Sequence, residues 1–149
     1  MKTSDSSCSV EQTQAAKIEP PPLLTREPDT QRKTPEVYFN MQEGVLKISG
    51  RSLHENSLEY YAPLLHWLGE WVNIADKVTH PVTVSFYIEY FNTTSSKMLY
   101  EFMKKLVMLN LKGVDVTIKW YYEDDDMLEA GEDYRDLIKL PFTLIEYIQ

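Results

Sequence analysis

VTVSFYIEYFNTTSSKMLYEFMKKLVMLNL, residues 82–111, contains both a strand pattern and a helix pattern and decides the fold. The first ten residues alternate between two faces and are rich in β-branched and aromatic side chains, which predicts a β-strand. Both faces are largely apolar, so we expect this strand to be central. From Leu99 onward the apolar residues recur at helical spacing, with lysines mostly on the other face. That pattern predicts an amphipathic helix.

Five short polar side chains join the strand to the helix. They are Asn92, Thr93, Thr94, Ser95 and Ser96. Such side chains accept hydrogen bonds from the first N–H groups of a helix, so one of them should be the N-cap. Consecutive hydroxyls exceed what one cap needs. A phosphoryl group there would carry about −1.5 to −2 charges and face the positive end of the helix dipole. The turn is therefore predicted to tolerate phosphorylation and to change its surface charge sharply.

The length and composition predict one compact domain with an appendage, since the chain has 149 residues and is 43% hydrophobic. Apolar runs stay well short of the roughly 20 residues of a membrane span. The first ten residues lack the apolar core of a secretory signal. A lone cysteine, Cys8, allows neither an internal disulfide nor a thiolate metal cluster. Together these features predict a cytoplasmic protein without membrane insertion.

The formal charge of −8 is concentrated in one segment, because residues 123–136 hold eight acidic side chains against Arg135. Nucleic-acid binding depends largely on neutralising phosphates with basic residues, so this balance argues against a nucleic-acid partner. An acidic run of this kind is typical of a solvated face, and a basic protein partner is the alternative.

The first 34 residues differ in composition from the rest of the chain. They are rich in proline and small polar residues and contain no aromatic residue. Such a segment cannot bury enough apolar surface to offset its ordering entropy, which predicts a disordered tail over residues 1–34 and a folded domain over residues 35–149.

Two short alternating runs, residues 36–41 and 45–49, predict a β-hairpin with Gly44 in the left-handed conformation. A helix follows, with Asn56 or Ser57 as its N-cap. Pro63 lies after its first turn and lacks a backbone donor, so we expect an irregular first turn or a kink there.

The remaining elements continue the alternation of strands and helices. Gly113 suits the end of the central helix, and residues 114–121 alternate as a strand. Residues 126–140 predict a helix capped by Asp125 or Asp126, and residues 142–148 predict a strand at an edge. The apolar face of that helix comprises Met127, Ala130, Tyr134, Leu137 and Ile138.

The expected order is therefore β-β-α-β-α-β-α-β, an α/β fold with a mixed sheet and helices packed on it. Right-handed crossovers would place residues 92–96 at the carboxyl edge of the sheet. Open α/β sheets bind ligands or react at that edge.

Catalytic signatures are sparse. The sequence has no Gly-rich phosphate-binding motif and no nucleophile elbow, and His54, His66 and His80 lack metal-ligand spacing. The acidic run does not continue as a calcium-binding loop. A hydroxyl nucleophile in the turn would need a base, and the sequence shows no obvious one. We therefore predict no catalytic residue, no metal and no cofactor.

Four segments match a known family in one order and at matching separations. They are GVLKISGRSLHENS (44–57), EYFNTTSSK (89–97), WYYEDDDMLEAGEDY (120–134) and LPF (140–142). The chain resembles the SiaC-type regulatory phosphoproteins over residues 35–149. The fold of that family is similar to that of STAS-domain anti-sigma-factor antagonists.

The resemblance implies partner switching. Family members are phosphorylated on a threonine of an NTSS-like turn by a dedicated kinase and dephosphorylated by a PP2C-like phosphatase. The unphosphorylated form binds and activates a diguanylate cyclase of the GGDEF type, which makes cyclic di-GMP and so controls biofilm formation and aggregation. Asn92 matches the family's asparagine and Thr93 its phosphoacceptor. Because Thr94 stands beside Thr93, Thr94 and Ser95 are alternative acceptors.

The partner surface implied by this match is residues 92–96, with Glu55, Asn56 and Ser57 as a second candidate whose simpler role is helix capping. A phosphate in an apolar interface would weaken binding, whereas an arginine cluster on a partner would prefer it. Two other functions stay open: a constitutive scaffold, and a small enzyme that uses a hydroxyl of residues 93–96.

Overall fold

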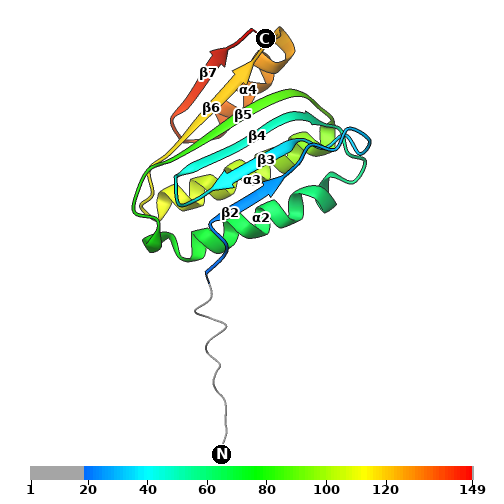
Figure 1. The fold of residues 1–149 in the computed structure, drawn as a ribbon. Helices are drawn as coiled ribbons and strands as arrows, with labels where there is room; N and C mark the ends of the chain where they lie inside the picture. Colours follow the sequence, from blue (N-terminus) through cyan, green and yellow to red (C-terminus); the bar gives the residue numbers. More distant parts are fainter. Residues whose placement is uncertain (1–18, 149) are drawn as a thin grey trace, which may run out of the picture.

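The computed structural model describes residues 19–148, which form a layered α/β structure (Figure 1). The strands are β2 (Leu23–Arg26), β3 (Glu36–Asn40), β4 (Val45–Ser52), β5 (Val82–Phe91), β6 (Val116–Tyr122) and β7 (Phe142–Glu146). The helices are α2 (Ser57–Asn73), the short 3-10 helix η2 (Ala75–Lys77), α3 (Thr93–Leu111) and α4 (Asp125–Leu137). From β3 onward the order of strands and α-helices is the predicted one.

The strands form one mixed sheet in the order β2-β3-β4-β5-β6-β7. The pairs β2-β3 and β3-β4 are antiparallel, and β4-β5, β5-β6 and β6-β7 are parallel. The predicted α/β class and mixed sheet are confirmed. Gly44, with φ of 72°, closes the predicted β3-β4 hairpin, and Gly113, with φ of 107°, follows α3.

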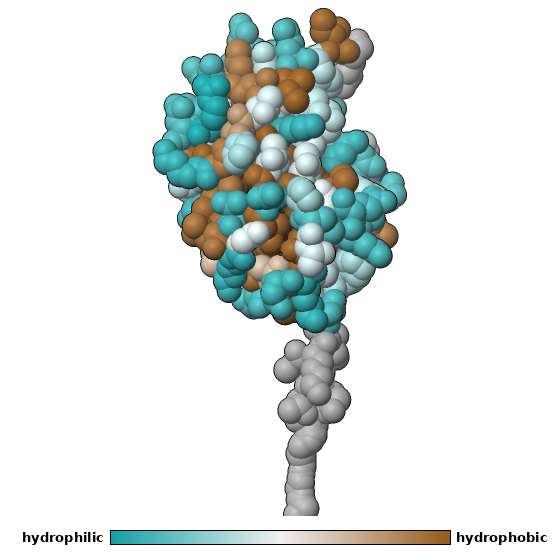
Figure 2. All heavy atoms as spheres, turned by 90° about the vertical axis from the view of Figure 1, so that its left-hand side faces the viewer, coloured by the Kyte–Doolittle hydropathy of each residue, from teal (hydrophilic) through white to brown (hydrophobic). Residues whose placement is uncertain are grey.

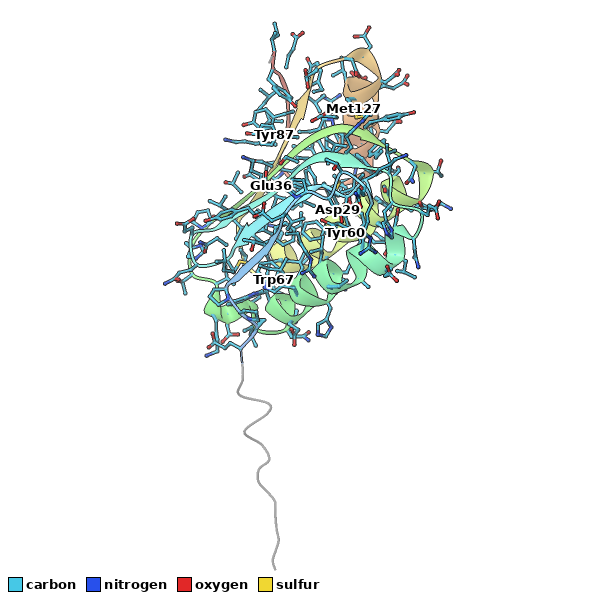
Figure 3. All side chains as sticks on the ribbon, turned by 45° about the vertical axis from the view of Figure 1, so that its right-hand side comes forward. Asp29, Glu36, Tyr60, Trp67, Tyr87 and Met127 are labelled. Carbon is cyan, nitrogen blue, oxygen red and sulfur yellow. The ribbon has the colours of Figure 1, made fainter. Side chains whose placement is uncertain are left out.

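All α-helices of residues 19–148 lie on one face of the sheet (Figure 1). Each crossover from β4 to β7 moves one strand in the same direction, and right-handed crossovers then place every helix on the same side. No helix of residues 19–148 covers the other face, which we call the open face. Tyr87 stacks there on Tyr121 with ring centroids 4.0 Å apart, and Lys47 lies 5.0 Å from the Tyr87 ring. Figure 3 shows Tyr87 on the open face and Trp67 along α2.

Strand β5 is central, as its sequence predicts. Val82, Val84, Phe86 and Ile88 point toward the helices and are buried. Phe86 contacts Trp120 of β6, with ring centroids 5.6 Å apart. Burial of each such side chain contributes about 1.5–3 kcal/mol to the free energy of folding. This packing fixes the end of β5, and with it the turn that follows.

The predicted disordered tail is wrong for residues 19–34. Strand β2 pairs with β3, the Trp67 indole N–H donates to the Pro21 carbonyl (2.6 Å), and the Met41 N–H donates to the Pro22 carbonyl (2.7 Å). The prolines are compatible with an ordered segment, because they accept these hydrogen bonds through their carbonyl groups. The backbone N–H that proline lacks is not needed at the edge of a sheet. Residues 1–18, the rest of the predicted tail, lie outside the described residues.

α2 is one helix from Ser57 that continues through Pro63, and the carbonyl group that loses its donor belongs to the exposed Glu59. A kink at Pro63 stays a prediction. Two other local predictions for the helices are wrong. α4 is capped by Asp124, one residue before the predicted candidates, through a 2.9 Å bond from the Met127 N–H. Leu137, predicted to face the core, is 59% exposed.

Figure 2 shows the end of the molecule where α2 and α3 lead back into β5 and β6, opposite the turn of residues 92–96. Hydrophobic residues form patches among hydrophilic ones on this face. Within residues 19–148 no helix combines the length and the hydrophobicity needed to cross a membrane.

Candidate functional site: the hydroxyl turn

The predicted turn lies where expected, at the carboxyl edge of the parallel strands. Asn92 is the N-cap of α3, and its side-chain oxygen accepts the Ser95 N–H at 2.9 Å. Its backbone N–H donates to the Ser52 carbonyl (3.2 Å) and its amide group to the His54 carbonyl (3.3 Å). Asn92 therefore starts the helix and also ties it to the end of β4.

A buried hydroxyl cluster lies beneath the turn and consists of Ser52, Ser57, Tyr61 and Ser95. Each of these residues is at most 2% exposed. The Ser52 hydroxyl donates to Ser95 (2.9 Å) and shares a 2.7 Å bond with Tyr61, while Ser57 shares a 3.0 Å bond with Ser95. Ser57 also donates to the His54 carbonyl at 3.2 Å. The cluster joins the first turns of α2 and α3.

Burial raises the pKa of the Tyr61 hydroxyl well above its ordinary value, and the hydrogen bond with Ser52 only partly opposes this. The buried hydroxyl cluster is therefore neutral at physiological pH. Its hydroxyls satisfy one another where water cannot reach, which makes their role structural.

The four hydroxyls of the turn differ in their surroundings. Ser95 is fully buried, and Ser96 shares a 3.1 Å bond with the Tyr134 hydroxyl, which also donates to the Ser96 carbonyl at 2.8 Å. Thr94 donates to the Asn92 side chain (3.1 Å) and shares a 3.0 Å bond with Ser57. Thr93 is exposed, and its hydroxyl makes no hydrogen bond to any residue of 19–148. Thr94 is exposed as well, so Thr93 differs from it in having a hydroxyl without a hydrogen-bond partner among the described residues.

The second predicted group separates into different roles. Asn56 caps α2, accepting the Glu59 N–H at 3.1 Å, which confirms one of the two predicted caps. Ser57 is buried in the hydroxyl cluster, and only Glu55 projects freely at the surface. Beside them, Arg32 pairs with Glu59 (3.1 Å) and lies 3.1 Å from the His54 ring.

Sequence reasoning missed Ser52, Tyr61 and Tyr134 as parts of the site. Ser52 is the last residue of β4, and Tyr61 and Tyr134 occupy helix positions that read as core. The family match could have pointed to two of them, since its segment 44–57 contains Ser52 and its segment 120–134 ends at Tyr134.

The chemistry of the site suits modification of a surface hydroxyl. Thr93 is the first residue of α3, where unpaired N–H groups and the helix dipole favour negative charge. Among the described residues, no group of three or more His, Cys, Asp or Glu side chains is placed to hold a metal ion.

A family model described as SiaC family regulatory phosphoprotein matches residues 28–147. The chain belongs to the SiaC family. An uncharacterized protein of Pseudomonas aeruginosa strain UCBPP-PA14 is 26% identical over 119 residues, which cover 78% of this chain and 91% of that protein.

Solved structures of SiaC share the fold. The crystal structure of apo-SiaC from Pseudomonas aeruginosa is 24% identical and matches with a TM-score of 0.72, covering 83% of this chain and 98% of that one. A chain in the crystal structure of the diguanylate cyclase SiaD in complex with its activator SiaC, from the same organism, matches with a TM-score of 0.70 and 23% identity. The match covers 83% of this chain and 99% of the other. The resemblance to STAS domains stays a prediction.

Proposed function

We propose that this SiaC-family protein is a phosphorylation switch without enzymatic activity of its own, in which Thr93 is the phosphoacceptor. The observation that carries the proposal is the difference among the hydroxyls of the turn: Thr93 is exposed and has no hydrogen bond within residues 19–148, while Thr94, Ser95 and Ser96 are held by neighbours. A kinase reaches the Thr93 hydroxyl without opening the fold. A PP2C-like phosphatase restores it.

The alternative acceptors fit less well. Phosphorylation of Thr94 would break its contacts with Asn92 and Ser57, and Ser95 is inaccessible without separating α2 from α3. Phosphate on Thr93 breaks no bond and lies at the favourable end of the helix dipole. The described residues place no hydrogen-bonded base at Thr93, so the proposal assigns it no catalytic role.

The proposed target of the unphosphorylated form is a diguanylate cyclase of the GGDEF type, which this protein activates. Support comes from the family and from the related SiaC, which is the activator in a complex with the cyclase SiaD. Because the kinase uses ATP and the cyclase uses GTP, the protein acts in the cytoplasm. Glu55 and residues 92–96 form the surface proposed to contact partners.

A capture experiment in lysate of the source cell tests this function. The baits are the wild type, Thr93→Ala, Thr93→Glu and, as the matched control, Thr94→Glu. A GGDEF-type cyclase should be enriched on the first two baits and at least tenfold depleted on Thr93→Glu. Equal capture by all baits would reject Thr93 as the switch, and depletion on Thr94→Glu alone would move the switch to Thr94.

A further inference from the structure

The helices are unevenly packed, and this leaves a groove between α3 and α4. α2 and α3 pack along each other, whereas α4 packs mainly on strands β5, β6 and β7. Gly131 permits this close approach, because a Cβ atom there would lie 2.7 Å from the Trp120 Nε1 atom. α4 therefore lies close to the sheet instead of filling the space beside α3.

Two adjoining cavities of about 410 and 530 Å³ make up the groove, and both are lined by Tyr100 and Leu137. Met108 and Leu137 are 49% and 59% exposed there. The groove runs from Ser96 to Met108 along α3, about 18 Å at the helical rise of 1.5 Å per residue. Its apolar lining includes Phe91, Tyr100, Val107, Ala130, Leu137 and Ile138.

The two ends of the groove carry opposite charge. The end beside the hydroxyl turn has three carboxylates against Lys97: Asp126, Glu129 and Asp133. The far end has three lysines against Glu101: Lys104, Lys105 and Lys139. The shared residues Tyr100 and Leu137 lie between the two ends. A twofold rotation about this midpoint superimposes the acidic end of one molecule on the basic end of another.

We propose that the α3–α4 groove is a self-association surface, and that its occupant is a second copy of this chain, related by a twofold axis near Leu137. In a closed twofold dimer the same patch meets itself, so a patch with opposite charges at its ends is complementary to its own copy. The exposed Leu137 side chains meet at the centre and cover each other's apolar surface. At each end of the interface the acidic side chains of one copy meet the lysines of the other, and these contacts fix the antiparallel register of the two copies.

The same geometry links self-association to the proposed switch, and only this step rests on the proposed function. Thr93 precedes Lys97 by four residues, so both lie on one side of α3 at the acidic end. A phosphate on Thr93 adds negative charge opposite the lysines of the second copy. Phosphorylation therefore strengthens the dimer and covers the surface beside the turn, whereas dephosphorylation weakens the dimer and shifts the equilibrium toward the monomer that binds the cyclase.

Charge exchange between two variants of the full chain tests the dimer without any other partner. One variant carries Lys104→Glu and Lys139→Glu, and the other carries Glu129→Lys and Asp133→Lys. In sedimentation velocity each variant alone should dimerise at least tenfold more weakly than the wild type. An equimolar mixture should recover the wild-type affinity within threefold, since both ends are then complementary. A mixture that stays monomeric overturns the proposal, as does a wild type that is monomeric throughout.

Separate variants test the apolar centre of the groove and the link between self-association and phosphorylation. Leu137→Lys should abolish self-association, and Leu23→Lys, at a side chain 50% exposed at the other edge of the sheet, should leave it unchanged. Thr93→Glu should tighten the dimer severalfold in low salt, with a smaller gain in high salt. An unchanged or weaker Thr93→Glu dimer removes the link to phosphorylation. If the dimer behaves as expected but no cyclase is captured, the proposed function fails and the self-association surface stands.

Discussion

Ser95 lies at the centre of the buried hydroxyl cluster and bonds to both Ser52 and Ser57. Ser95→Ala removes one hydrogen-bond partner from each of these serines in a site closed to water. We expect a loss of about 1–2 kcal/mol in the free energy of unfolding, the usual cost of leaving buried hydroxyls underbonded. Urea unfolding followed by tryptophan fluorescence measures it.

Thr93→Ala is the matched control, since it removes a hydroxyl two residues away that has no bonded partner among residues 19–148. Its stability should stay within about 0.5 kcal/mol of the wild type, as for most surface changes. If the two variants unfold at the same urea concentration, the assignment of Ser95 to structure and Thr93 to the surface is wrong.

Tyr134 makes stability sensitive to alkaline pH. Burial raises the pKa of Tyr134 to about 12, against an ordinary value near 10 in the unfolded chain. Between these values the folded state holds a proton that the unfolded state releases, so stability is fully present below pH 10 and falls as pH rises through 12. The unfolding midpoint, measured from pH 8 to 11.5, should fall less steeply with rising pH for Tyr134→Phe than for the wild type. An identical slope for both chains would contradict this role.

The position of the site could be predicted from residues, but the roles within it could not. Asn92 and its four hydroxyl neighbours follow a strand pattern and precede a helix pattern, which places them at the carboxyl edge. Nothing in the local sequence shows that Thr93 is exposed and that Ser95 is buried. The difference arises from Ser52 and Ser57, about 40 residues earlier in the chain, which reach Ser95 only through the parallel pairing of β4 with β5.

Helical spacing predicts which side of a helix is apolar but not whether a neighbouring helix covers that side. Leu137 has the spacing of a core residue, yet it is the last residue of α4, and the helices within residues 19–148 leave it 59% exposed. α2 continues through Pro63 because the carbonyl group that loses its donor belongs to an exposed residue, where water can satisfy it.

Gly131 determines how closely α4 approaches the sheet. In Gly131→Ala the added methyl group meets the Trp120 ring and Leu144, which the packed core holds in place. Overpacking usually costs about 1–3 kcal/mol, and the better helix propensity of alanine returns up to about 1 kcal/mol. We expect a net loss of about 1–2 kcal/mol, measured by thermal and urea unfolding.

Gly69→Ala in α2 is the control for helix propensity. A Cβ atom there meets only the end of the flexible Lys105 side chain, at 3.5 Å. This variant should be as stable as the wild type or up to about 1 kcal/mol more stable. If Gly131→Ala and Gly69→Ala are both more stable than the wild type, α4 does not need a glycine to pack closely on β6.

For the whole molecule, the strand and helix order from β3 to β7 follows from periodicity and turn residues, and the mixed sheet follows from the alternation. The start of the domain could not be found in this way. Residues 19–34 have the composition of a disordered segment, but β2 gains its order from the edge of β3 and from Trp67, far away in the sequence. The composition of a segment does not show which distant residues will contact it in the folded chain.

A chain that begins at Pro35 should be less stable than one that begins at Glu19. Its Met41 N–H and Trp67 indole N–H lose the carbonyl groups of Pro22 and Pro21, at about 1–3 kcal/mol each, and β3 becomes an open edge. Urea unfolding should show a loss of roughly 2 kcal/mol or more, with greater aggregation. Equal midpoints would show that β2 is dispensable.

In the proposed function, phosphate on Thr93 switches the protein between partners. The most direct measurement is the rate of cyclic di-GMP synthesis by the captured cyclase, with added chain that is either unmodified or stoichiometrically phosphorylated on Thr93. We predict that the unmodified chain raises the rate and that the phosphorylated chain leaves it at the basal level. Equal stimulation by both forms would contradict the switch.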